Sequence, residues 1–162
     1  MMEFSQEEFE EILNIFNDES DEIVHRLNNN ILTLEKNPEN KDIIIELFRD
    51  AHSLKGAARM IGFNDIQAVA HKIEDILGLA KESKLTINSE VTDAIYKSID
   101  FIKMNIELSV KAKKEVKLND YSKYITALDS IVKSPITKEK TEPVIQKEIE
   151  IPEDSTIFAF IV

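Results

Sequence analysis

Cysteine is absent from this chain of 162 residues, and the signals of several protein classes are missing as well. Without cysteine there can be no disulfide, no thiolate metal site and no cysteine nucleophile. The first residues, MMEFSQEEFE, lack the basic and apolar regions of a signal peptide. No apolar run approaches the ~20 residues that a membrane-spanning helix needs. We therefore expect a cytoplasmic protein with no direct membrane contact.

Glycine is scarce, and acidic residues outnumber basic ones. The three glycines, Gly56, Gly62 and Gly78, do not form the glycine-rich loop that nucleotide-binding enzymes use to hold phosphates. We therefore expect no ATP site in this chain and no enzyme that acts alone. The formal net charge of -11 argues against binding to nucleic acid or to an anionic membrane, because both are polyanions.

Apolar residues recur at intervals of three and four, which is the pattern of packed amphipathic helices. The pattern predicts five helices, at about 6–35, 38–61, 64–82, 89–116 and 120–132. Short connections make neighbouring helices antiparallel, so we expect the first four to form an up-down bundle, followed by a fifth C-terminal helix. The predicted fold class is all-α.

Signals for helix ends accompany these segments. Ser5, with Glu8 three residues later, predicts a capping box at the start of the first helix. Gly62 can adopt the left-handed C-cap conformation at the end of the second helix. Asn64, with Gln67 three residues later, is expected to cap the third helix. The second and third helices are thus predicted to form a tight antiparallel hairpin.

The helical pattern ends near residue 133. Residues 134–155 mix prolines and charges without a sustained apolar face, which is typical of a flexible linker. Residues 156–162, TIFAFIV, are apolar and prone to form β-structure, so we interpret them as a tail that either docks or begins a truncated next domain. We expect one helical domain over residues 1–133, then the linker and the tail.

The second predicted helix carries an unusual polar face. His52, Lys55, Gly56 and Arg59 are three or four residues apart and share one side, while the apolar residues between them turn toward the core. A glycine within a helix costs roughly 1 kcal/mol relative to alanine, so Gly56 is best explained if a partner must approach the backbone closely. Gly78, on the third helix, is interpreted either as a similar opening or as a simple weak point.

The hairpin brings part of the third helix opposite His52. His52 lies ten residues before the turn, so position 72 is expected across from it, between His71 and Glu74. If Glu74 accepts a hydrogen bond from one imidazole nitrogen, the other nitrogen keeps a free lone pair. His52 is then an oriented nucleophile. If the electrophile is a phosphoryl group, Lys55 and Arg59 supply positive charge to it. For Arg59, this role rests only on its spacing from His52.

The residues of this face resemble the signature of histidine phosphotransfer (HPt) domains. Within that family, the chain is similar to the amino-terminal HPt domains of chemotaxis histidine kinases of the CheA type. The resemblance covers about residues 5–132 and rests on three segments, His52-Ser-Leu-Lys55-Gly56, Gly62-Phe63 and His71-Lys-Ile-Glu74. Arg59-Met60 departs from the small polar pair that is more usual in the family.

The resemblance implies a five-helix domain in which His52 is phosphorylated at Nε2. In the family, the residue at the place of Glu74 bonds Nδ1, the lysine matching Lys55 assists the phosphoryl group, and the histidine matching His71 completes the polar network. The implied partners are a histidine kinase catalytic domain as phosphoryl donor and a response-regulator receiver domain as acceptor. These partners would supply ATP and Mg²⁺, and this chain would bind no cofactor itself. We expect a monomeric domain, either part of a kinase or free-standing.

Two other functions fit the same residues. His52, His71 and Glu74 could share a cation in a metal-binding bundle, although di-iron bundles need paired ExxH motifs and the chain has one HxxE in reverse order. The bundle could also be a docking module without chemistry. Replacing His52 distinguishes these functions, because phosphotransfer would be lost outright and docking would hardly change.

Overall fold

The computed structural model describes residues 3–133, and in this range the chain forms five α-helices and no strand. The helices are α1 (Gln6–Lys36), α2 (Lys41–Ile61), α3 (Asn64–Lys81), α4 (Ser89–Ala112) and α5 (Tyr121–Lys133). The predicted all-α fold class is confirmed. The predicted linker at 134–155 and the predicted tail at 156–162 lie outside the described residues, so both stay predictions.

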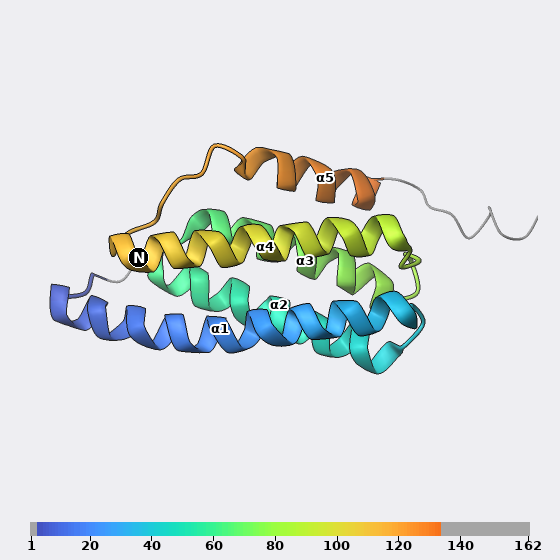
Figure 1. The fold of residues 1–162 in the computed structure, drawn as a ribbon, viewed down its shortest axis with the longest axis horizontal. Coiled ribbons are helices and arrows are strands. Elements are labelled where there is room, and N and C mark those ends of the chain that lie inside the picture. Colours follow the sequence, from blue (N-terminus) through green and yellow to red (C-terminus); the bar gives the residue numbers. More distant parts are fainter. Residues whose placement is uncertain (1–2, 134–162) are drawn as a thin grey trace, which may run out of the picture.

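The first four helices form the predicted up-down bundle, and α5 lies along α3 and α4 (Figure 1). α2 and α3 are antiparallel neighbours in a hairpin, and α1 packs against α2 and α4. None of the helices in residues 3–133 combines the length and the apolar character that a membrane crossing requires. The interior is mainly apolar; among its largest fully buried side chains are Leu27, Leu47, Leu54, Phe63, Ile66, Ile73, Ile95 and Phe101.

Core packing sets the rotation of α2 about its axis. Ala51, Leu54 and Ala58 are buried and lie on one side of the helix. Polar residues on the other side of α2 therefore face solvent. From α1, the Arg26 guanidinium makes a bidentate contact with the Asp50 carboxylate, with Nη2 2.9 Å from Oδ1 and Nε 3.2 Å from Oδ2. This pair adds a polar link between α1 and α2.

The helix ends follow local capping chemistry with small shifts. The Ser5–Glu8 capping box is present in α1, and Gly62 ends α2 in the left-handed conformation, with φ of 80°, as predicted. α2 begins at residue 41 rather than 38, because the Asn40 side chain accepts a hydrogen bond from the Ile43 backbone N–H and acts as the N-cap.

The predicted cap of α3 is wrong. Asn64 is the first residue of the helix, and the N-cap residue is Phe63, which is buried and has no acceptor group in its side chain. A distant carboxylate takes over: Glu115, between α4 and α5, accepts a hydrogen bond from the Asp65 backbone N–H at 2.7 Å. Lys117 Nζ lies 2.9 Å from Asp65 Oδ1 and 3.1 Å from Glu115 Oε2, so it bridges the two carboxylates.

The segment that carries Glu115 leaves α4 earlier than expected. α4 ends at residue 112 rather than 116, because Lys113 adopts the left-handed conformation with φ of 56° and turns the chain. The buried Ser109 hydroxyl then accepts a hydrogen bond from the Val116 backbone N–H at 2.9 Å. This bond anchors the segment beside the start of α3, where Glu115 can cap the helix.

We predict that Glu115→Ala lowers the free energy of unfolding by about 1 kcal/mol, the typical cost of removing a helix N-cap. The matched control is Glu107→Ala on α4, because the Glu107 side chain is exposed and has no hydrogen bond or ion pair within residues 3–133. That variant should stay within about 0.5 kcal/mol of the wild type. Urea denaturation followed by circular dichroism measures both. Equal effects of the two substitutions would show that Glu115 is not the cap.

Candidate functional site

His52 is displayed on the solvent-facing side of α2. Its side chain is 64% exposed, whereas the adjacent Ala51 and the nearby Leu54 are buried. The exposure follows from the rotation of α2, which directs its apolar stripe into the bundle. An external group can therefore reach the imidazole without any rearrangement of the core.

Glu74, on α3, holds one nitrogen of the His52 ring. His52 Nδ1 lies 2.9 Å from Glu74 Oε2, and the Glu74 side chain is only 12% exposed. An ionised carboxylate can only accept hydrogen bonds, so Nδ1 carries the hydrogen and donates it. Nε2 of His52 has no hydrogen-bond partner among the described residues. In the neutral imidazole this nitrogen therefore keeps its lone pair free.

Lys55 binds the same carboxylate. Its Nζ lies 3.0 Å from Glu74 Oε1 and 2.9 Å from Oε2, and its side chain is 21% exposed. Lys55 follows His52 by three residues, so both side chains leave the same face of α2 and converge on one residue of α3. The hairpin register expected from the turn at Gly62 is thus present.

The pKa of Glu74 reflects two opposing effects. Burial by itself raises the pKa of this carboxyl, because a charge is less stable away from water. The hydrogen bonds from Lys55 and His52, together with their charges, outweigh burial, and the net result is a pKa below the ordinary value of a glutamate. Glu74 is therefore ionised at neutral pH, as its role as a hydrogen-bond acceptor requires.

His71 does not join this hydrogen-bonded group in the structure. Its side chain is 54% exposed, and Nε2 lies 3.5 Å from Oδ1 of Asp75, one turn along α3. The sequence already shows that Asp75 follows His71 by four residues, a spacing that brings two side chains together on a helix. Asp75 was nevertheless not among the predicted site residues. The role that the family resemblance implies for His71, completion of the polar network, stays a prediction.

Arg59 and Gly56 lie on the exposed side of α2. The Arg59 side chain has no hydrogen bond or ion pair within residues 3–133, so its predicted role toward a phosphoryl group stays a prediction. At Gly56, a Cβ atom would meet nothing within 4 Å. The packing of this domain therefore does not require glycine there, and the surface next to His52 is open for close approach.

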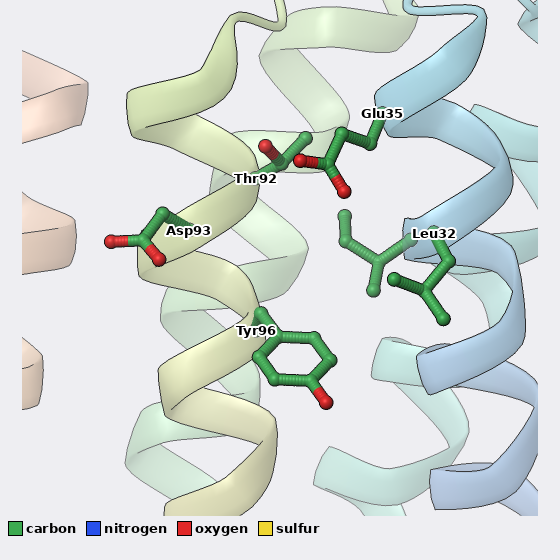
Figure 2. Close-up of a pocket in the computed structure, with 6 residues that line it drawn as sticks. Leu32, Glu35, Thr92, Asp93 and Tyr96 are labelled. Atoms are coloured by element: carbon green, nitrogen blue, oxygen red, sulfur yellow. The ribbon is translucent and has the colours of Figure 1, made fainter.

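A separate hollow lies between α1 and α4 (Figure 2). It is lined by Ile31, Leu32, Glu35, Thr92, Asp93 and Tyr96, and none of these residues belongs to α2 or α3.

Within residues 3–133, no group of three or more histidine, aspartate or glutamate side chains is placed to hold a metal ion.

Sequence comparison matches residues 11–109 to the model of the Hpt domain family. The chain is 36% identical over 121 residues to the chemotaxis protein CheA of Borreliella burgdorferi, a match that covers 75% of this chain and 14% of that protein. It is 37% identical over 98 residues to CheA of Treponema pallidum, covering 60% and 12%. The chain thus spans about a seventh of the length of the curated relatives it matches.

Solved structures agree with this assignment. The CheA phosphotransferase domain from Thermotoga maritima is 37% identical with a TM-score of 0.61, covering 66% of this chain and 99% of that one. The histidine phosphotransfer domain of CheA in solution is 34% identical with a TM-score of 0.69, covering 75% and 91%. The phosphorylated P1 domain of CheA3 from R. sphaeroides, in complex with CheY6, shares the fold at 21% identity and a TM-score of 0.71, over 75% and 94%. With the family model matched over residues 11–109, this chain belongs to the Hpt domain family.

Proposed function

We propose that this chain accepts a phosphoryl group on Nε2 of His52 and passes it to an aspartate of a response-regulator receiver domain. The observation that carries the proposal is the 2.9 Å contact between His52 Nδ1 and Glu74, which leaves Nε2 unpartnered on an exposed face. A histidine in this state is a nucleophile held in one tautomer. Membership of the Hpt domain family supports the same chemistry.

In the proposed reaction, the Nε2 lone pair attacks the γ-phosphorus of ATP. An Nε2–P bond forms, the bond from phosphorus to the bridging oxygen breaks, and ADP leaves with that electron pair. The ring keeps its hydrogen on Nδ1 and gains positive charge, which the adjacent Glu74 carboxylate stabilises. In the second step, an aspartate carboxylate attacks phosphorus, the Nε2–P bond breaks and the lone pair returns to Nε2.

Lys55 contributes through charge. It balances Glu74 before the reaction, so that a phosphoryl dianion does not face an unpaired carboxylate. Its ammonium group is also close enough to His52, through their shared contact with Glu74, to assist the incoming phosphoryl group. We assign Arg59 a secondary role toward the phosphoryl group, because only its spacing from His52 supports that role.

The donor and the acceptor are other domains. A histidine kinase catalytic domain would supply ATP and Mg²⁺, and the receiver domain would bring its own Mg²⁺, with no cofactor resident in this chain and no ATP site of its own. The names of the relatives, chemotaxis protein CheA, and the solved complex of a CheA3 P1 domain with CheY6 support these partners. The open surface at Gly56 would let either partner reach His52. For this function, we expect the domain to act in the cytoplasm, where ATP is available, and as a monomer.

We predict that His52→Gln abolishes labelling of this chain by radioactive ATP in the presence of a CheA-type kinase catalytic domain. The wild type should carry label that is lost in acid, is stable in base and moves to a receiver domain, as expected for phosphohistidine. His25→Gln is the matched control, because His25 is also exposed on a helix but lies on α1, with Asn29 as its hydrogen-bond partner. Labelling that persists in His52→Gln would contradict the proposal.

We predict that Lys55→Met raises the pKa of Glu74, because burial would then act with less opposition. Carbon-13 NMR titration of the glutamate carboxyl measures the pKa. Lys97→Met, which removes the exposed Lys97–Asp93 pair on α4, is the control and should leave the pKa of Glu74 unchanged. A fall in the pKa of Glu74, or no change in Lys55→Met, would refute the assigned role of Lys55.

The lowered pKa of Glu74 also predicts how stability depends on pH. A carboxyl group whose pKa is lower in the folded than in the unfolded state stabilises the fold above its unfolded pKa, about 4.3 for glutamate, and this contribution is lost as pH falls through the folded pKa. Urea denaturation from neutral pH down to acid pH should therefore show a smaller loss of stability in Glu74→Gln than in the wild type. Parallel curves for the two proteins would contradict the pKa assignment.

A further inference from the structure

An aromatic side chain closes the contact between α2 and α3 one helical turn from His52 and Glu74. Phe48 precedes His52 by four residues on α2, and Gly78 follows Glu74 by four residues on α3. A Cβ atom on Gly78 would lie 3.4 Å from Cε2 and 3.9 Å from Cδ2 of Phe48. The ring therefore lies against the backbone of α3. A methyl group would just reach contact there, and any longer side chain would displace the ring.

A cation holds the ring from another direction. The Nζ atom of Lys81, at the end of α3, lies 4.1 Å from the centroid of the Phe48 ring, a distance typical of a cation–π contact. Phe48 is only half-buried, yet both of these contacts come from α3. The ring thus links the two helices that carry the candidate site.

The site needs a fixed spacing of α2 and α3. The contacts of Glu74 with His52 and Lys55 are 2.9–3.0 Å long, so they form at only one spacing of the two helices. Phe48 and Gly78 lie at the next level of the hairpin, on the side away from the turn at Gly62.

We propose that Phe48, lying against Gly78, is a positioning residue for the phosphoacceptor histidine. It holds α2 and α3 at the spacing where Glu74 accepts the Nδ1 hydrogen of His52, and it thereby selects the tautomer whose Nε2 is free. The relevance to phosphotransfer rests on the proposed function. Phe48 touches no reacting atom and acts through Glu74. Gly78 is then the part of α3 that the ring lies against, where a side chain longer than a methyl group would displace it.

The test is the tautomer of His52 in the full chain, measured by nitrogen-15 NMR with labelled histidine at about pH 8.5, where a histidine of ordinary pKa is neutral. In the wild type, Nδ1 should carry the hydrogen. In Phe48→Ala, and in Gly78→Leu, which displaces the ring without altering Phe48, we expect both nitrogens to shift toward a mixture of tautomers. Phe48→Leu is a milder variant in case Phe48→Ala does not fold.

The matched control is Phe9→Ala, since Phe9 is also a partly buried phenylalanine but lies on α1. It should leave the nitrogen shifts of His52 unchanged. When Phe48→Ala and Gly78→Leu are combined, the leucine can occupy the space left by the ring, so the Nδ1–H form should return in part. Wild-type shifts in the folded single variants, an equal change in Phe9→Ala, or simple addition of the two single effects would each overturn the proposal.

The same variants separate this inference from the proposed function. If phosphorylation proceeds as proposed, Phe48→Ala should slow phosphoryl uptake from the kinase domain by about tenfold to a hundredfold, because small misplacements of reacting groups have effects of this size. The tautomer is measured with neither kinase nor ATP. If the variants lose the tautomer preference and the wild type never takes label, the result would refute phosphotransfer and support the positioning role. Label with an unchanged tautomer would refute the positioning role alone.

Discussion

The register of the α2–α3 hairpin is the constraint on which the site depends. His52 and Glu74 lie on different helices, and their 2.9 Å contact exists only when the two helices meet at one offset and one spacing. The turn sets the offset, because Gly62 takes a left-handed conformation and the next residue, Phe63, is buried against Phe16 with ring centroids 5.5 Å apart. One level further on, the aromatic ring of Phe48 lies against Gly78 of α3, and in our proposal it sets the spacing. Backbone conformation and core packing together therefore hold a polar contact at the surface.

Charge balance makes this contact compatible with the proposed phosphoryl chemistry. A carboxylate next to a phosphoryl acceptor would repel the incoming dianion if it stood alone, and in a chain with a net charge of -11 no general surplus of positive charge offsets it. Glu74 does not stand alone, because Lys55 and His52 both donate hydrogen bonds to it. The carboxylate thus stays ionised while buried, orients the imidazole and presents little free negative charge to a partner.

The three glycines have different surroundings in the folded chain, and so different reasons for the missing side chain. Gly62 is needed for its backbone conformation, with φ of 80°. Gly56 has open space around it, so only an approaching partner gives a reason for its missing side chain. Gly78 faces the Phe48 ring across the helix pair. From the sequence, Gly56 was interpreted as an opening and Gly78 as an opening or a simple weak point, because spacing along one helix does not show what the neighbouring helix places opposite.

The sequence by itself determined the helices, their antiparallel order and the pairing of His52 with Glu74, because apolar periodicity, capping signals and a short turn are local features whose consequences can be counted along the chain. Only the tertiary structure decided which side chains bind one another at those positions. It placed Glu115 at the start of α3 from 50 residues away, left His71 with Asp75, and joined Lys55 to Glu74 rather than leaving it free. The physical reason is that a side chain's partner depends on the relative rotation and spacing of whole helices, which core packing sets and no local pattern records.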